Sequence, residues 1–192
     1  MSHFFAYLAR MKDIRRWSLM RNTTYENDQE HATQVAILAH ALALIHNEHN
    51  SDALIDAQKC ATLALFHDAS EVITGDMATP IKYFNPEIAA AYKSLEKVAQ
   101  EKLLDMLPDN LRESYRPLLL PDTTTPEWRI VKAADCLAAY LKCVDETKAG
   151  NSEFVKAKTA TLNKAISLNM PEVYIFLNEF ASSFGLTLDE LN

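Results

Sequence analysis

The chain has 192 residues, of which 48% are hydrophobic and 23% charged, the balance of a folded domain with a sizeable apolar core. Only three glycines occur, which disfavours a β-sandwich or a glycine-rich dinucleotide loop and predicts an all-α fold. The net charge of −7 argues against a nucleic-acid polymer as partner. A small anionic substrate is still compatible with it, because a bound metal and a few basic residues can reverse the local field.

The cysteines and the chain start indicate where the protein works. Cys60, Cys136 and Cys143 are odd in number and form no Cys-x-x-Cys pair, which favours buried free thiols in a reducing compartment. The first residues, MSHFFAYLARMKDIRRW, carry charge too early for a signal peptide, and no apolar run has the length of a membrane span. We therefore expect a cytoplasmic protein without membrane contact, folded as one domain over residues 1–192.

The first predicted element is a short amphipathic helix over residues 2–12, with one apolar stripe formed by Phe4, Phe5, Leu8 and Met11. A basic segment from Asp13 to Asn22 follows, and it includes Arg16 and Trp17. One interpretation is a connecting loop whose tryptophan fills the core. The other is a binding loop in which an arginine meets a phosphate and the indole offers a flat face to a base.

A long helix is predicted from residue 28 to about His46, capped by Asn27 or Asp28. His31 lies in its first turn, four residues before Val35, and therefore faces inward. Alone, such a histidine is more often a core or capping residue than a ligand. Three further histidines lack partners at ligand spacing and are interpreted as structural or exposed: His40, His46 and His49.

The next predicted helix covers residues 52–68 and leads into LALFHDASEVITGDMATP. It brings His67 and Asp68 side by side, with Glu71 three residues later, and the helical pattern gives way at Thr74-Gly75-Asp76. Imidazole and carboxylate together suit Zn, Mn, Fe, Co or Ni.

The rest of the chain is predicted to be helical over residues 86–107, 108–119, 126–149, 152–166 and 171–184. Asp135 lies mid-helix among small and apolar residues, where a carboxylate needs a partner. A buried ion pair and a metal ligand are equally compatible with that position. His31, His67-Asp68 and Asp135 would then offer ligands from three helices, in the order typical of HD-domain metal-dependent phosphohydrolases.

Six stretches carry a closer resemblance: RRWSLMRN, ENDQEH, HDASEVITGD, TPIKYFN, VKAADCLAAYLKC and LTLDE. They resemble the bacterial YfbR-type 5′-deoxynucleotidases over almost the whole chain, and the protein is identified as a member of that family. The resemblance implies a helical, dimeric enzyme that uses one divalent metal to hydrolyse 5′-deoxyribonucleoside monophosphates. Co²⁺ or Mn²⁺ is the first expectation for the metal, and Zn²⁺, Cu²⁺ and others stay open.

The same resemblance implies roles for individual residues. The implied metal ligands are His31, His67, Asp68 and Asp135, and Glu71 matches the catalytic acid. Nucleotide contacts are implied for Arg16, Trp17, His31, Asp68, Asp76 and Thr79. One departure is Ala78, which stands where the family pattern has a proline before the threonine.

The implied chemistry also follows from the residue types. A divalent metal neutralises phosphate charge and activates water, and Glu71 is placed to accept or relay its proton. Two alternatives stay open: an HD phosphohydrolase acting on a nucleoside triphosphate or a cyclic phosphodiester, and an inactive HD nucleotide-binding module. A triphosphate would call for more cations, and Lys82 is the only further one expected near these motifs.

Overall fold

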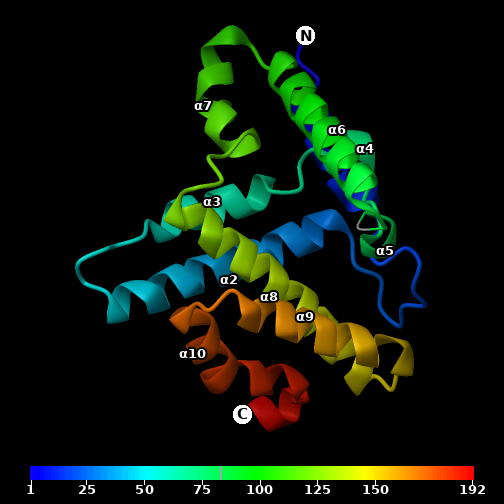
Figure 1. Ribbon diagram of the computed structural model, residues 1–192, viewed down its shortest axis with the longest axis vertical. Coiled ribbons are helices and arrows are strands. Elements are labelled where there is room, and N and C mark those ends of the chain that lie inside the picture. Colours follow the sequence, from blue (N-terminus) through cyan, green and yellow to red (C-terminus); the bar gives the residue numbers. More distant parts are fainter. Residues whose placement is uncertain (83) are drawn as a thin grey trace.

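The computed structural model describes residues 1–82 and 84–192, so Tyr83 of the TPIKYFN stretch lies outside the described residues. Within these ranges the regular structure is helical (Figure 1), and the one β feature is an isolated bridge between Arg15 and Asn27. The predicted all-α fold is confirmed. None of the described helices is both long and apolar enough to cross a membrane.

The N-terminal helix is shorter than predicted. Helix α1 covers Phe4–Leu8 and continues as a 3-10 turn, η1, over Ala9–Asp13. Phe4 and Met11 are buried, but Phe5 is 57% exposed, so the predicted four-residue stripe is only partly right. Phe4 and Phe5 are neighbours on an α-helix of 3.6 residues per turn, so their side chains point about 100° apart and only Phe4 faces the core.

Helix α2, Asp28–His49, begins as predicted. The Asn27 side chain accepts a hydrogen bond from the Glu30 backbone N–H, and the Glu30 side chain accepts one from the Asn27 N–H. This reciprocal pair satisfies two helix-end donors and assigns the cap to Asn27. Asp28 is therefore not needed for capping, and its side chain is fully buried.

Helix α3 covers only Ala57–Phe66, which corrects the predicted range of 52–68 at both ends. Asp56 caps the start by accepting from the Lys59 N–H. At the other end the Ala69 N–H bonds to the Phe66 carbonyl, a tighter three-residue turn that ends the α-helix. His67 and Asp68 thus lie just beyond the helix rather than within it.

Two short helices follow. Helix α4, Glu71–Thr74, ends at Gly75, whose φ of +72° lies in the left-handed region that glycine adopts without steric cost. The break predicted at residues 74–76 is confirmed. Helix α5, Thr79–Lys82, was not predicted from the sequence.

The remaining helices agree with the predicted positions to within a few residues. Helices α6, Pro86–Asp105, and α7, Asp109–Leu119, form a hairpin at one end of the molecule, and the C-terminus lies at the opposite end (Figure 1). The C-terminal part consists of α8, Pro126–Lys148; η2, Ser152–Phe154; α9, Val155–Ser167; α10, Pro171–Glu179; η3, Ala181–Gly185; and η4, Leu188–Leu191. The end of the predicted helix 171–184 is therefore a 3-10 turn.

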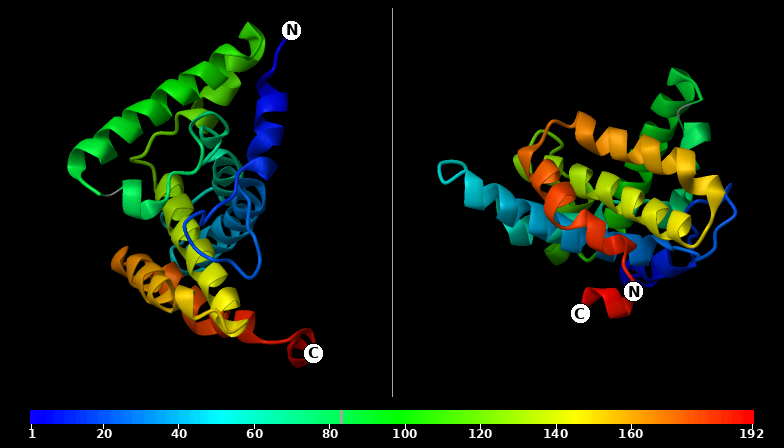
Figure 2. Two further views of the ribbon diagram at one scale, coloured as in Figure 1. Left: turned by 90° about the vertical axis from the view of Figure 1, so that its right-hand side faces the viewer. Right: turned by 90° about the horizontal axis from the view of Figure 1, so that it is seen from below.

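Helices α2, α3 and α8 pack around one apolar cluster that includes Leu42, Leu63 and Leu137. Helix α8 crosses α2 near the middle of the molecule, and α9 lies along α8 (Figures 1 and 2). A second cluster, with Phe4 and Leu104, attaches the α6–α7 hairpin to the N-terminal segment. Each fully buried leucine or phenylalanine contributes roughly 1.5–3 kcal/mol, so the first cluster holds these three helices firmly in place.

Candidate active site

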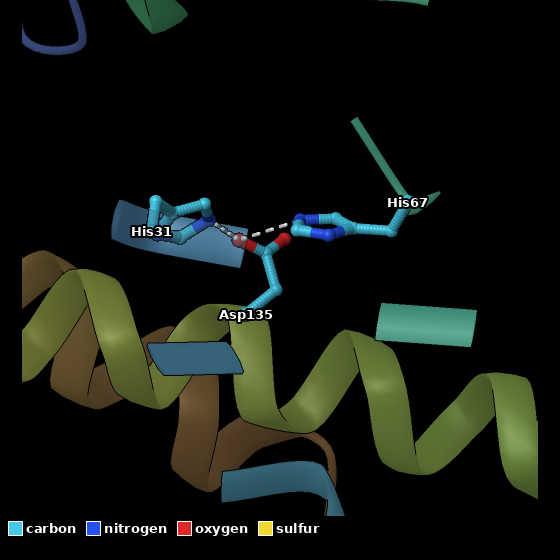
Figure 3. A group of neighbouring side chains, drawn as sticks. All are labelled: His31, His67 and Asp135. Carbon is cyan, nitrogen blue, oxygen red and sulfur yellow. Dashed lines mark hydrogen bonds and ion pairs between the residues drawn. The ribbon is translucent and has the colours of Figure 1, made fainter. Parts of the chain in front are cut away.

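His31, His67 and Asp135 converge although 104 residues separate the first from the last (Figure 3). His31 comes from the first turn of α2, His67 from the turn after α3, and Asp135 from the middle of α8. His31 Nε2 lies 3.2 Å and His67 Nε2 4.0 Å from Asp135 Oδ1. One ligand atom from each residue lies within 4.8 Å of the others, a spacing that can hold a metal ion.

Asp68 borders the same point. Its Oδ2 atom lies 3.0 Å from His67 Nε2 and 3.8 Å from His31 Nε2. Burial opposes ionisation of Asp68, but His67 and then Arg16 outweigh it and lower its pKa. The carboxylate is therefore ionised, which is the form that binds a metal.

The tautomer of His67 is set by its backbone contact. Its Nδ1–H donates to the Ala64 carbonyl at 2.7 Å, so Nε2 is the nitrogen that faces the acids: protonated it pairs with Asp68, and in the neutral ring its lone pair can bind a metal. The Nε2 atom is buried and forms no hydrogen bond of good geometry with a described residue. Metal-binding histidines are commonly oriented by a hydrogen bond from their other ring nitrogen, as Nδ1–H makes here with the Ala64 carbonyl. Two imidazoles and two carboxylates around this buried nitrogen fit a divalent cation.

Lys132 is a site residue that sequence reasoning missed. Its Nζ lies 2.9 Å from Asp135 Oδ2, one helical turn away on α8. Asp135 and then Asp68 raise the pKa of this ammonium against its burial, so Lys132 is charged. Lys82, the cation expected near the motifs, forms an ion pair with Glu96 at 2.8 Å and also opposes the rise of the Asp76 pKa. The three-residue spacing between Lys132 and Asp135 was the available signal.

Glu71 and Asp28 form a buried acidic pair beside the histidines. Burial, then Asp68 and Asp28, raise the pKa of Glu71 to about 11. Burial also raises the pKa of Asp28 to about 7. A side-chain hydrogen bond with Glu71, and then the charge of Arg16, oppose this rise of the Asp28 pKa. At neutral pH this pair holds at least one proton, and Asp28 was missed because the sequence suggested only a cap.

Arg16 enters the site from the loop before α2. Its Nη1 atom lies 3.2 Å from Asp68 Oδ2 and 3.7 Å from Asp28 Oδ1. Glu26 accepts hydrogen bonds from both Arg16 Nε and Trp17 Nε1, at 3.2 and 3.1 Å. The indole of Trp17 packs on Phe154 with ring centroids 5.4 Å apart. The position of Arg16 therefore fits the interpretation of this segment as a binding loop. The packing of Trp17 also fits the other interpretation, in which the tryptophan fills space in the core.

The loop after α4 approaches the site only in part. Burial raises the pKa of Asp76. Arg16 opposes this rise and Asp68 adds to it, so the Asp76 carboxyl lies near both side chains. Thr79 is exposed at the first position of α5, and its side chain makes no hydrogen bond to a described residue. The carbonyl of Ala78 accepts from the N–H groups of Ile81 and Lys82. Because a proline carbonyl can do the same, Ala78 preserves the start of α5.

A cavity of about 350 Å³ opens next to Arg16 and is bordered by residues of the same loop. Its lining is basic and polar: Arg15, Arg16, Ser18, Met20, Arg21, Asn22 and Tyr25. In a protein of net charge −7, such a basic hollow is suited to an anionic ligand.

A family model described as 5′-deoxynucleotidase YfbR-like matches residues 3–184. The chain belongs to the YfbR-like 5′-deoxynucleotidase family. A curated 5′-deoxynucleotidase from Vibrio vulnificus is 52% identical to this family member over 192 residues, covering 100% of this chain and 98% of the relative. The predicted family is thereby confirmed.

Solved structures support the fold of this YfbR-like protein. An HD-domain phosphohydrolase from Listeria innocua aligns with a TM-score of 0.77 at 22% identity, over 95% of this chain and 88% of that one. A cyanophage S-2L HD phosphohydrolase, solved with dA and one catalytic Zn²⁺, aligns with a TM-score of 0.61 at 16% identity, over 93% and 96%. The predicted HD-type helical fold is confirmed.

Proposed function

We propose that this protein hydrolyses 5′-deoxyribonucleoside monophosphates to deoxynucleoside and phosphate with one divalent metal ion. The observation that carries the proposal is the convergence of His31, His67, Asp68 and Asp135 beside Glu71. It occurs in a chain that matches curated 5′-deoxynucleotidases along its whole length. An inactive binding module would be expected to lack one of these groups.

We assign the metal to His31, His67, Asp68 and Asp135. When bound, such an ion neutralises phosphate charge and lowers the pKa of water at the site. We propose Co²⁺ or Mn²⁺ as the working metal, because mixed imidazole and carboxylate ligands suit both. Zn²⁺ is the next candidate, since it is the ion named with the cyanophage neighbour.

We assign the proton transfers to Glu71, which lies beside the proposed metal ligands and can act as general acid and general base. Water attacks phosphorus as the bond from phosphorus to the sugar 5′-oxygen breaks, and the 5′-oxygen needs a proton in return. Because its pKa is raised, Glu71 starts protonated; it gives that proton to the departing oxygen and takes one from the attacking water, which restores its protonated form. Its buried Oε2 atom, without a described hydrogen-bond partner, is available for this exchange.

We assign phosphate binding to Arg16, whose guanidinium already lies among three acids and whose charge is retained. His31 and Asp68 border the same phosphate. Trp17, held beside Arg16 through Glu26, would cover the sugar or base. Asp76 is assigned to the sugar 3′-hydroxyl, and Thr79, exposed at the start of α5, to the outer edge of the nucleotide. A 2′-hydroxyl would crowd Asp76, which favours deoxyribose.

The alternative substrates are less well supported. Lys132 adds a cation that the sequence argument against a triphosphate did not count. Even so, the monophosphate is favoured, because the chain is 52% identical over its whole length to a curated 5′-deoxynucleotidase.

Two further properties are part of the proposal. The protein is assigned to the cytoplasm because Cys60, Cys136 and Cys143 are buried free thiols. We propose a homodimer as the working unit, as the family resemblance implies. We also propose one domain over residues 1–192, since the site draws on elements from Arg16 to Asp135.

The decisive experiment is phosphate release from dAMP, dTMP, AMP and UMP by protein stripped of metal and reloaded with Co²⁺, Mn²⁺, Zn²⁺ or Mg²⁺. Glu71→Gln should lose activity while retaining one ion per chain. Glu48→Gln is the matched control, because Glu48 is exposed near the end of α2.

Equal rates on ribo and deoxy substrates would overturn the role of Asp76 but keep the enzyme class. Absence of phosphate release with every metal, while one ion binds, would overturn the monophosphate assignment. Nucleoside triphosphates and cyclic phosphodiesters would then be tested.

A further inference from the structure

A buried ion pair lies on α8 away from the metal ligands. Lys142 Nζ and Glu146 Oε1 are 2.5 Å apart, one helical turn from each other, with side chains only 8% and 1% exposed. A pair of charges one turn apart on a helix can usually reach water. Here both charged side chains are buried away from water, and the cost of desolvating them has to be offset by partners for every polar atom.

The partners of this pair are backbone groups of the loop that carries Arg16 and Trp17. Glu146 Oε2 accepts from the Thr23 N–H at 2.8 Å, and Oε1 accepts from the Thr24 N–H at 3.1 Å. Lys142 donates to the Thr24 carbonyl. Asn151 donates to Glu146 at 2.8 Å and to the Arg21 carbonyl at 2.7 Å. The ionised pair therefore binds the loop by its main chain.

The loop is held at its base as well. The Arg16 N–H bonds to the Glu26 carbonyl at 3.0 Å, and the Asp28 N–H bonds to the Ile14 carbonyl at 3.1 Å. Between base and tip, Trp17 has a φ of 57°, a left-handed conformation that a bulky residue adopts only when its surroundings impose it. Within the loop, the Trp17 carbonyl accepts from the Met20 N–H at 2.9 Å and from Asn22 Nδ2 at 3.2 Å, and its indole N–H donates to Glu26.

The indole is connected to the ion pair by a second route. Trp17 packs on Phe154, a fully buried ring. Lys142 Nζ lies 5.7 Å from the centroid of that same ring, within the range of a cation–π contact. The pair therefore supports Trp17 both through the loop backbone and through Phe154.

We propose that Glu146 and Lys142 are positioning residues of the active site, which hold Arg16 and Trp17 against the metal centre through the backbone of Thr23 and Thr24. Helix α8 carries both Asp135 and Glu146, about 16 Å apart along the axis at 1.5 Å per residue. One rigid helix thus fixes the positions of a metal ligand and of the substrate-binding loop relative to each other. The inference rests on the proposed function in that Arg16 and Trp17 bind the nucleotide.

The first test reads Trp17 directly and does not depend on activity. In a Trp128→Phe background, Trp17 is the single tryptophan of the full chain. Glu146→Gln provides one acceptor oxygen where the carboxylate provides two, so one loop N–H loses its bond. We expect acrylamide quenching of Trp17 to rise by about threefold as the loop opens locally. Glu127→Gln is the matched control, because Glu127 also lies on α8 and the substitution removes its ion pair with Lys59 of α3.

The second test is the kinetics of dAMP hydrolysis by the metal-loaded protein. A loop that positions substrate predicts a KM for dAMP about tenfold higher, equivalent to about 1.4 kcal/mol, with kcat changed much less. The affinity for Co²⁺ should be unchanged. If Glu146→Gln fails to fold, Asn151→Ala serves instead, since it removes one bond to the loop, at the Arg21 carbonyl, and one bond to Glu146 itself.

Unchanged quenching in both variants would overturn the inference. So would a loss of kcat at constant KM, or equal effects in Glu127→Gln. If wild-type protein releases no phosphate, the proposed function fails, but the quenching result still decides whether the ion pair positions Trp17.

Discussion

The two carboxylate oxygens of Asp135 face different partners: Oδ2 lies 2.9 Å from Lys132 Nζ, and Oδ1 lies 3.2 Å from His31 Nε2. Burial raises the pKa of Asp135, but Lys132 and the two histidines outweigh it and hold that pKa well below its usual value. The lysine therefore keeps the carboxylate ionised and leaves one oxygen directed at the histidine pair.

Substitution Lys132→Met should weaken metal binding. Partners of this kind typically contribute about 10–100-fold in metal affinity, because they orient the ligand that they contact. A Co²⁺ titration of the stripped protein measures the effect, with Lys132→Arg as the charge-preserving control. Tighter binding in Lys132→Met would mean that repulsion between the ammonium and the cation outweighs the orientation of Asp135.

Removal of the metal should lower the melting temperature. An ion present at about 100 times its dissociation constant stabilises the folded state by about 2.7 kcal/mol. For a chain of this length that corresponds to a shift of about 5–10 °C. Calorimetry before and after chelation measures it. Asp135→Asn is expected to show no chelator-dependent shift, and a full shift in that variant would contradict the ligand assignment.

The acidic pair should make the metal-free protein less stable as the pH rises. The pKa of Asp28 is raised from 3.8 to about 7, so the folded protein binds a proton that the unfolded chain has already released. Stability is then lost between these two values as the pH rises. Asp28→Asn should be more stable than wild type at pH 8 by about 1–3 kcal/mol, measured by urea unfolding of chelated protein. A parallel pH dependence in wild type and Asp28→Asn would contradict this.

Glu146 should have the opposite pH dependence. Burial is outweighed by Lys142 and by the Thr23 backbone, and the pKa of Glu146 is lowered from 4.5 to about 2. Its stabilising effect is therefore present above its unfolded pKa and is lost as the pH falls toward 2. The stability difference between wild type and Glu146→Gln should narrow by about 2 kcal/mol between pH 7 and pH 3. Chemical unfolding at the two pH values measures it, and a constant difference would argue against a buried, ionised Glu146.

Much of the fold was predictable because local signals agree with tertiary packing. Asn27, Asn85 and Thr125 each cap a helix that the sequence predicted. Helix α3 was the main exception. The helix was predicted to continue to Asp68, but the three-residue turn after Phe66 ends it, and that turn depends on contacts that periodicity does not encode.

The candidate site divides in a similar way. The residue types and their order could be read from the amino-acid sequence, because His31, the His67-Asp68 pair and Asp135 each occupy an inward position on or next to a helix. The folded chain was needed to show that Lys132 pairs with Asp135, that Asp28 is buried beside Glu71, and that Glu146 binds the Arg16 loop. These relationships depend on how helices distant in sequence pack together, and the charge of a side chain does not reveal which distant backbone or carboxylate it will meet.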